Sequence, residues 1–214
     1  AKNKIKADMP LMPPEQVALS ETLGRVLAKD VAARRTQPPH AVSAMDGYAV
    51  QAEDVENLPA SLNVVGHVPA GQAYDGSVAK GQAVRIFTGA TIPAGADTIV
   101  IQENTERDGK LVKVIDGKAP PGRFIRPAGL DFCEGDTLLS AGHTITARDI
   151  SLTAGMNVPW LTVRRKPRIA LLATGDEIVM PGDPVGPNQI VSSNGPALAA
   201  FITARGAIPV DLGI

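Results

Sequence analysis

The sequence is poor in the residues that most structural metal sites and disulfide frameworks need. Its 214 residues include a single cysteine, Cys133, and three histidines. One cysteine excludes an intramolecular disulfide framework and is typical of a reducing compartment. So few thiol and imidazole groups also disfavour a structural zinc site. We therefore expect a cytoplasmic protein that is stabilised by its core rather than by cross-links.

Aromatic residues and excess charge of one sign are scarce as well. Phe, Tyr and Trp make up 3% of the chain, and 21 basic residues face 22 acidic ones, for a net charge of -1. Nucleic-acid binding uses exposed aromatic platforms or a basic surface, and the sequence indicates neither. No run approaches the ~20 apolar residues of a membrane-spanning helix, and no secretory signal is visible. We expect neither nucleic acid nor membrane among the partners.

Glycine and proline, by contrast, are abundant, with 21 and 18 residues, and they divide the chain into zones. Residues 31–134 hold short β-branched runs, such as LNVVGHV, DTIVIQEN and LVKVI, bounded by Gly, Pro, Asp and Asn. This pattern predicts a mostly-β domain without long helices. The Asp108–Gly109 pair between two such runs predicts a hairpin turn.

Shorter patterns flank this zone. Residues 14–30 predict a strand near 17–19 and a short helix at about 21–27. Residues 147–156 predict a helix that begins with a capping box formed by Thr146 and Asp149.

A different pattern begins at Arg168. The continuous apolar run over 169–173 predicts a strand buried on both faces, as in a parallel sheet. A helix over 195–206 follows, with Asn194 as its cap, and then a second buried strand within 207–214. Strand, helix and strand form one right-handed crossover unit. Because a parallel sheet should continue from there, we expect the chain to be a fragment.

Four polar residues stand beside glycine at the end of an apolar stretch, where the backbone can approach a ligand closely. They are Asp46, Thr88, Asp131 and Glu177. Each also has a structural interpretation. The Asp46–Gly47 pair fits a hairpin turn, the residues after Thr88 fit a simple turn, Asp131 fits a turn cap and Glu177 fits a solvated surface charge.

The stretch from Thr174 to Glu177 follows the buried strand directly. In parallel α/β sheets, ligands bind beyond the carboxyl ends of the strands. Free backbone N–H groups at this point could bind a phosphate, although Asp176 and Glu177 would repel it. A cation would remove that conflict, and carboxylate oxygens are suitable ligands for Mg²⁺.

Four long motifs occur together in one order along the chain. They are PPHAVSAMDGYAV, RIFTGATIPAGADTIVIQENT, GRFIRPAGLDFCEGDTLLSAGHTI, and PRIALLATGDEIVMPGDPV followed by IVSSN. In sequence and spacing they resemble the bacterial molybdopterin molybdenumtransferases, to which the C-terminal domain of gephyrin is related. The resemblance runs from about Pro14 to Ile214. It departs from the usual family pattern at Thr91, where proline is common, and at Ser192, where an acid is common.

The resemblance implies a multidomain fold. Residues 14–30 and 135–166 would form a small, discontinuous linking domain, and residues 31–134 a β-rich domain. Residues 167–214 would start a parallel α/β domain of the molybdopterin-binding type, which is incomplete here. Residues 1–13 would pack with that α/β domain. Family members are homodimers, so we expect a site that two subunits share.

The resemblance also implies an activity. The family inserts molybdenum from molybdate into adenylylated molybdopterin, releases AMP and requires Mg²⁺. The catalytic residues would be Asp46, Thr88, Asp131 and Glu177, and the three acids among them would be the metal ligands. Substrate binding is expected at Ser43, Gly47, Gly89, Thr174, Gly175, Asp176 and Asn194. Further partners would be the molybdopterin adenylyltransferase and acceptor molybdoenzymes.

Two consequences for chemistry follow from this assignment. Thr88 and the N–H group of Gly89 could bind oxyanions as preorganised donors. Clustered carboxylates should raise one another's pKa in the absence of a cation, so activity and metal binding should fall together on acidification.

Other functions remain open at this point. The chain could be a non-catalytic pterin-binding or scaffolding module. It could be a Mg²⁺-dependent nucleotide hydrolase, which would release AMP without molybdate. An unrelated β-rich binding protein would leave the four polar sites far apart.

Overall fold

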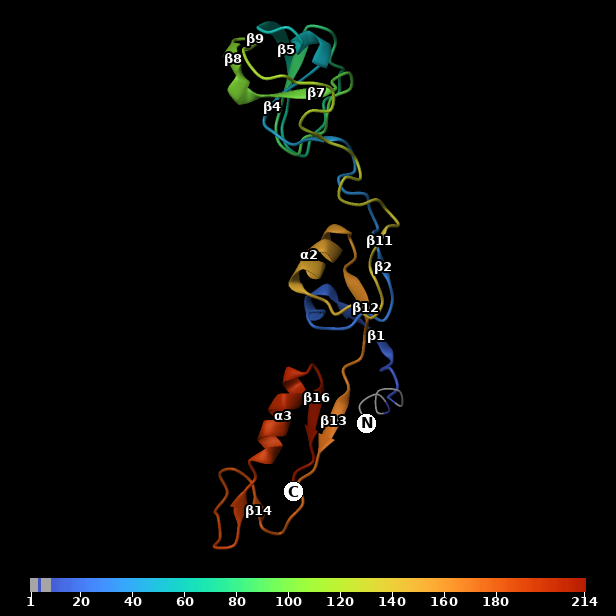
Figure 1. The fold of residues 1–214 in the computed structure, drawn as a ribbon, viewed down its shortest axis with the longest axis vertical. Coiled ribbons are helices and arrows are strands. Elements are labelled where there is room, and N and C mark those ends of the chain that lie inside the picture. Colours follow the sequence, from blue (N-terminus) through green and yellow to red (C-terminus); the bar gives the residue numbers. More distant parts are fainter. Residues whose placement is uncertain (1–3, 5–8) are drawn as a thin grey trace. The chain divides into compact units, whose positions relative to one another are not determined.

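The computed structural model describes residue 4 and residues 9–214, and the chain divides into two compact units (Figure 1). Ala33–Asp136 form one unit, here called the β unit. Ala1–Ala32 and Thr137–Ile214 form the other, here called the flanking unit. The prediction that residues 1–13 pack with an α/β domain lies mostly outside the described residues. Strands dominate both units, and helices are few.

A six-stranded sheet in the order β7-β4-β6-β5-β9-β8 is the centre of the β unit. Its strands are β4 (Gly47–Val50), β5 (Ala60–Val68), β6 (Gln82–Ile86), β7 (Thr98–Ile101), β8 (Thr105–Asp108) and β9 (Leu111–Val114). β5 and β6 are parallel, and the other neighbouring pairs are antiparallel. The predicted runs of short strands are therefore confirmed.

Shorter elements complete the β unit. β3 (Val42–Ser43) pairs with β10 (Ile125–Arg126), and two 3-10 helices, η2 (Ala52–Val55) and η3 (Gln102–Asn104), connect strands of the sheet. β8 and β9 pair as a tight hairpin around Asp108–Gly109, with Gly109 at φ 53°. That hairpin confirms the prediction for this Asp-Gly pair.

Strand β4 is buried on both faces of the sheet. Tyr48 and Val50 pack into a core cluster with Leu62 and Val112, while Ala49 packs into a second cluster on the opposite side. This alternation follows from the two-residue period of a strand. Packing on both sides therefore fixes the register of β4, and with it the position of the residue that precedes the strand.

The Asp46–Gly47 pair does not form a hairpin, so the turn interpretation of this pair is wrong. β3 and β4, which flank it, pair with different strands: β3 with β10, and β4 with β6 and β7. Gly47 lies within the sheet, opposite Ile86 and Ile101. A Cβ atom at Gly47 would lie 2.0 Å from the carbonyl oxygen of Val100. Glycine is needed here because β7 approaches closely. The packing of the sheet accounts for this glycine, and substrate binding at Gly47 stays a prediction.

The first part of the flanking unit is built from two antiparallel strand pairs and a helix. β1 (Pro14–Ala18) pairs with β12 (Trp160–Arg164), and β2 (Val31–Ala32) pairs with β11 (Thr137–Leu139). Helix α2 (Ala147–Gly155) begins with the predicted capping box: Thr146 Oγ1 accepts from Asp149 N–H, and Asp149 accepts from Thr146 N–H. The predicted helix at 21–27 is wrong. The 3-10 helix η1 (Leu19–Glu21) ends in a turn in which Gly24 has a φ of 72°.

The second part contains two parallel pairs. β13 (Arg168–Leu171) pairs with β16 (Ile208–Asp211), and α3 (Asn194–Ala204) connects them and lies alongside both (Figure 1). β14 (Ile178–Val179) pairs with β15 (Ile190–Val191). Each pair has two strands, so a larger parallel α/β domain stays a prediction. None of the helices in the described residues is long and apolar enough to cross a membrane.

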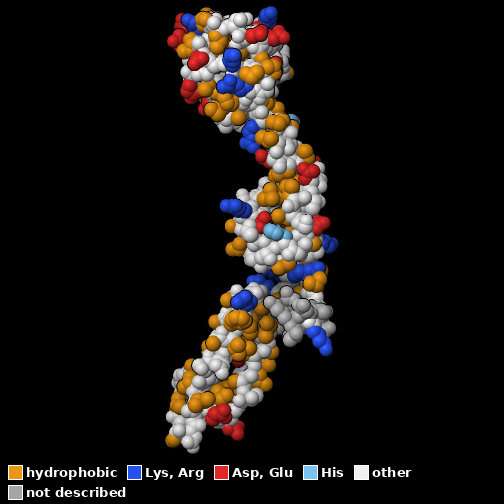
Figure 2. Space-filling model, in the orientation of Figure 1, with side chains coloured by type: hydrophobic (Ala, Val, Ile, Leu, Met, Phe, Trp, Pro, Cys, Tyr) orange, Lys and Arg blue, Asp and Glu red, His pale blue; other side chains and the backbone are white. Residues whose placement is uncertain are grey.

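Two details of this part differ from the prediction. Asn194 is the first residue of α3 rather than its cap, which is Ser193. Strand β13 is not buried on both faces, because within the described residues β16 is its only strand partner and Ile169 remains 41% exposed. Exposed hydrophobic side chains are therefore numerous over the segment that holds α3 and β13 (Figure 2).

We predict that Gly47→Ala destabilises the β unit by about 1–3 kcal/mol, because the added methyl group would overlap the backbone of β7. Both tyrosines, Tyr48 and Tyr74, lie in the β unit, whereas Trp160 lies in the flanking unit. Near-ultraviolet circular dichroism of tyrosine during urea unfolding therefore reports on the β unit.

Gly195→Ala is the control in the flanking unit, where the Trp160 signal reports on unfolding, because a Cβ atom there would meet only Ser192 Oγ, at 3.6 Å. It should leave stability unchanged or raise it slightly, since alanine favours the helix. Equal unfolding midpoints for native protein and Gly47→Ala would contradict the packing argument.

Candidate functional site

Asp46 lies between β3 and β4, and Thr88 lies two residues beyond the end of β6. The N–H group of Thr88 donates to Asp46 Oδ1 over 2.8 Å, and Thr88 Oγ1 donates to the same oxygen over 2.8 Å. Asp46 is half-buried and Thr88 is exposed. The structure therefore brings together two of the four predicted catalytic residues, which are 42 positions apart in the sequence.

The two hydrogen bonds use only one of the two carboxylate oxygens. Within the described residues, no hydrogen bond reaches Asp46 Oδ2. A carboxylate with one oxygen fixed and the other open has a defined orientation. Its open oxygen can still bind a cation or accept a hydrogen bond from a hydroxyl group.

The pKa of Asp46 is lowered from its ordinary value of 3.8. The main causes are the backbone and side-chain hydrogen bonds from Thr88, and the charge of Arg85 adds to them, while desolvation opposes them. Within this one copy, the groups that shift the pKa of Asp46 are hydrogen-bond donors and Arg85. Asp46 is accordingly ionised at neutral pH. The expectation that clustered carboxylates raise one another's pKa concerns a site shared by two copies and stays a prediction.

Ser43 and Gly89 hold the backbone next to Asp46 and Thr88 through hydrogen bonds. Ser43 is 1% exposed, and its Oγ donates to the carbonyl oxygen of Met45 over 2.6 Å, which shapes the turn before Asp46. The N–H group of Gly89 donates to the carbonyl oxygen of Ser43 over 2.8 Å. The donors of Thr88 and Gly89 thus have partners inside the protein, which corrects the expectation that they are free to bind an oxyanion.

Asp131 belongs to a separate cavity of the β unit, with a volume of about 380 Å³. Its Oδ1 accepts from Nη2 of Arg126 over 2.9 Å, and both side chains are exposed. Gly89 also lines this cavity, together with Arg35 and His40. The cavity therefore places one acid among basic groups, an arrangement that suits an anionic ligand better than a second cation.

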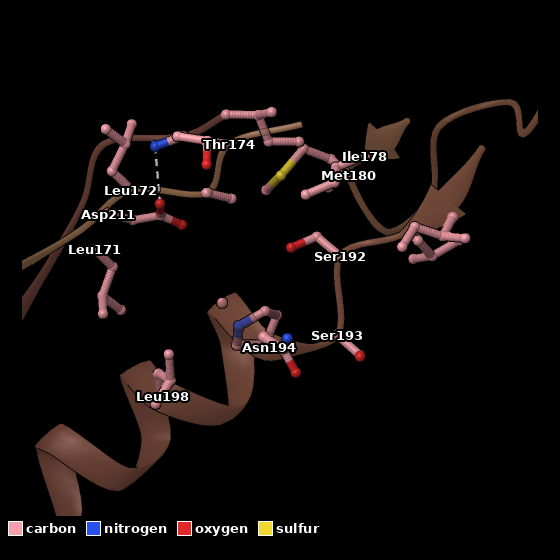
Figure 3. A pocket seen from close by; sticks show the side chains of 17 residues that line it. Leu171, Leu172, Thr174, Ile178, Met180, Ser192, Ser193, Asn194, Leu198 and Asp211 are labelled. Atoms are coloured by element: carbon pink, nitrogen blue, oxygen red, sulfur yellow. Dashed lines mark hydrogen bonds between the residues drawn. The ribbon is translucent and has the colours of Figure 1, made fainter. Parts of the chain in front are cut away.

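In the flanking unit a cavity of about 360 Å³ lies at the carboxyl ends of β13 and β16 (Figure 3). Thr174 and Asn194, both predicted to bind substrate, line it together with Ser192 and Asp211. Figure 3 shows Thr174 and Asp211 on one side of the cavity and Ser192 and Asn194 on the other. An Asp211 carboxylate oxygen accepts from the N–H group of Gly213 over 2.9 Å. Polar groups thus converge where ligands of parallel sheets bind.

Glu177 does not line this cavity. Its carboxylate folds back over Gly175, where a Cβ atom would lie 2.7 Å from both carboxylate oxygens. Asp176 and Glu177 are both exposed. Of the stretch from Thr174 to Glu177, only Thr174 lines this cavity, so a single site formed by all four residues stays a prediction.

Metal-binding potential is limited within each unit. In the described residues, no three His, Cys, Asp or Glu side chains come together as a metal cluster. Mg²⁺ in enzymes usually keeps several waters and is held by one or two carboxylates and substrate oxygens. The open oxygen of Asp46 fits that mode of binding, whereas Asp131 is already paired with Arg126.

The sequence analysis did not identify several residues near these sites, among them Arg85, Gln102, Arg126 and Asp211. Arg85 and Arg126 lie inside strand-like runs, where a basic residue gives no local sign of its partner. Asp211 carried a usable signal, because it ends the second strand of the crossover unit two residues before a glycine. An acid near a glycine at the end of an apolar stretch is also the pattern that identified the other acidic candidates.

Known proteins share both the sequence and the fold. Residues 1–156 match the family model described as MoeA N-terminal region (domain I and II). The molybdopterin molybdenumtransferase of Nostoc sp. is 42% identical over 204 residues, which cover 94% of this chain and 47% of that protein. The protein of the same name from Bacillus subtilis is 36% identical over 206 residues, covering 93% and 48%.

Solved structures agree with these sequence matches. A crystal structure titled as the molybdopterin biosynthesis MoeA protein from Pyrococcus horikoshii has a TM-score of 0.84 and 33% identity, and the match covers 98% of this chain and 55% of that one. The chain belongs to the MoeA family and carries its N-terminal region. It spans about half the length of the curated relatives that it matches.

We predict that Thr88→Val raises the pKa of Asp46, because valine removes the Oγ1 donor and leaves the backbone donor. Thr88→Ser keeps a hydroxyl group and should leave the pKa below 3.8. Carbon-13 NMR titration of the Asp46 carboxyl group measures both variants. The same pKa in native protein and Thr88→Val would show that the side-chain hydrogen bond is absent in solution.

Proposed function

We propose that this chain is the part of a molybdopterin molybdenumtransferase that supplies Asp46 and Thr88 to molybdenum insertion. The observation that carries the proposal is the fixed, ionised carboxylate of Asp46, whose second oxygen is open. Two relatives that align with more than 90% of this chain, at 42% and 36% identity, are named molybdopterin molybdenumtransferases. The proposed reaction transfers molybdenum from molybdate to adenylylated molybdopterin and releases AMP.

Basic and acidic residues of the chain would have different roles in this reaction. Both substrates are anions, and bringing anions together requires that their charge be neutralised. Arg35 and Arg126 line the Asp131 cavity and would attract and orient one anion there. Thr88 holds the Asp46 carboxylate in one orientation, so that its open oxygen would face the reactants. Thr174, Ser192 and Asn194 would offer polar groups to substrate in the flanking unit.

Mg²⁺, when bound, would supply the positive charge that offsets the negative charge of molybdate and phosphate. Asp46 is the residue of the β unit that best fits this role, with Asp131 and Glu177 as further candidate ligands. Ser43, Gly47 and Gly89 contribute indirectly, by holding the turn and strands around Asp46. Gly175 and Asp176 are kept as candidates for substrate contact. A cytoplasmic location and contacts with an adenylyltransferase or an acceptor molybdoenzyme also stay predictions.

Alternative functions make different predictions about the same assay. A pterin-binding or scaffolding module would bind pterin without releasing AMP. A nucleotide hydrolase would release AMP at the same rate with and without molybdate. The ordered Asp46–Thr88 pair favours catalysis over scaffolding, because a scaffold has no need of an oriented open carboxylate.

We predict that Asp46→Asn lowers molybdenum insertion by about 100-fold or more, because asparagine keeps the size of the side chain but removes its charge. The assay uses a chimera in which this chain replaces the matching part of the Nostoc enzyme. Molybdenum in the pterin product and AMP released are both measured.

Asp108→Asn is the matched control, because it changes an exposed Asp-Gly pair in the β8–β9 hairpin and an Asn-Gly pair fits that turn equally well. It should leave the rate unchanged. An Asp46→Asn chimera that is folded and retains more than about half of the activity would contradict the proposed role. AMP release that does not depend on molybdate would favour the hydrolase.

We also propose that two copies of the chain complete one site, with Asp46 from one copy and Glu177 from the other. Co-expression of an Asp46→Asn chimera with a Glu177→Gln chimera tests this. Random pairing makes half of the dimers mixed, and each mixed dimer would hold one intact site, so about a quarter of the native activity should return. No activity above that of the separate variants would show that each copy carries its own site.

A further inference from the structure

Arg85 and Gln102 form a closed ring of contacts around the backbone of Asp46 and Gly47. Nη1 of Arg85 donates to the carbonyl oxygen of Gly47 over 2.8 Å. The backbone N–H group of Gln102 donates to the carbonyl oxygen of Asp46 over 3.1 Å. Nη2 of Arg85 donates to the side-chain oxygen of Gln102, which closes the ring. Two successive carbonyl groups are therefore held by two residues that are bonded to each other.

Arg85 is itself held in one conformation. Its guanidinium carbon lies 4.5 Å from the ring centre of Phe87 and 5.3 Å from that of Tyr48. Tyr48 is 4% exposed and packs in the core of the β unit. His67 meets the Phe87 ring edge-on, at 5.3 Å between ring centres. The guanidinium plane is thus fixed by aromatic rings while its two arms reach different partners, an arrangement that lysine cannot reproduce.

The ring of contacts complements the hydrogen bonds from Thr88. Thr88 fixes the side chain of Asp46, whereas Arg85 and Gln102 fix the backbone that carries it. Without the bonds from Arg85 and Gln102, the peptide group of Gly47 could rotate. That rotation would move the Asp46 carboxylate even if the Thr88 side chain moved with it. A displacement of about 1 Å in a reacting group can reduce a rate by about 100-fold.

We propose that Arg85, through its bonds to Gly47 and Gln102, is the positioning residue that sets the orientation of Asp46. The inference rests on the proposed function, because it gives Arg85 its role through Asp46. Arg85 contacts no substrate in this account. Its effect belongs to the rate of the chemical step and not to substrate binding.

The test uses four single variants and the Arg85→Gln/Gln102→Leu double variant, in two settings. Arg85→Gln removes the guanidinium fork, Arg85→Lys keeps the charge without the fork, and Gln102→Leu removes the acceptor that closes the ring. Arg107→Gln is the matched control, because Arg107 is an exposed arginine of β8 whose Nε bonds only the carbonyl oxygen of Gly109, at 3.1 Å. Amide hydrogen exchange is measured on this chain, and kcat and KM on the chimera with the Nostoc enzyme.

Arg85→Gln and Gln102→Leu should each speed exchange of the backbone amide at position 102 by about 10-fold or more, after correction for the intrinsic rate of the residue there. Amides of the β8–β9 hairpin should stay unchanged. In the chimera, kcat should fall by about 10- to 100-fold and KM should change by less than about twofold. Arg85→Lys should not restore kcat. The double variant should be no slower than Arg85→Gln, because both changes open the same ring.

Other results would overturn the inference. Full activity in Arg85→Lys would show that charge alone matters, and a rise in KM with native kcat would show a role in binding. Should Arg85→Gln fail to fold, Gln102→Leu alone still decides, since it leaves the arginine in place. The exchange data also separate this inference from the proposed function. A chimera that inserts no molybdenum contradicts the proposed function. An unchanged exchange rate of the amide at position 102 in the variants contradicts the role of the ring of contacts.

Discussion

The close approach of β4 and β7 at Gly47 is the constraint on which the arrangement of the β unit depends. The carbonyl group of Val100 occupies the space that a side chain at position 47 would need. This approach lets Gly47 pair with β6 on one side and β7 on the other. Asp46, the preceding residue, is thereby placed at the end of both partner strands, where Thr88 and Gln102 can reach it.

The electrostatics of the site follow from that placement. Asp46 meets hydrogen-bond donors and the charge of Arg85, so its pKa is lowered and it is ionised at neutral pH. Asp131 is neutralised by Arg126 in a cavity with other basic groups. The β unit thus offers an oriented carboxylate at Asp46 with one open oxygen and, in the Asp131 cavity, a region suited to anions. A reaction between anions that uses a divalent cation needs both kinds of surface.

The sequence predicted features whose cause is local. Alternating β-branched runs located the strands of the β unit, and Asp108–Gly109 and Thr146–Asp149 located a hairpin and a helix start, because turn and cap chemistry depend on near neighbours. The predicted helix at 21–27 failed because Gly24 adopts a left-handed turn there. Strand β13 was expected to be buried, yet its apolar run says nothing about how many strands and helices cover it.

The candidate site was predictable only in part. Asp46 and Thr88 could be selected by their type and their neighbours, and their motifs carry the family resemblance. The role of Gly47 could not be predicted, because it depends on the backbone of a strand about 50 positions further along the chain. Arg85 and Gln102 were missed for the same reason: their partners are set by strand order, which no local pattern encodes.

The central claim is that Asp46 is held in one orientation by donors from Thr88. Scalar coupling across the hydrogen bond, between the amide nitrogen of Thr88 and the carboxyl carbon of Asp46, tests it most directly. The account predicts a measurable coupling at neutral pH, consistent with the 2.8 Å separation of the Thr88 nitrogen and Asp46 Oδ1. A well-resolved Thr88 amide signal with no coupling to Asp46 would contradict it.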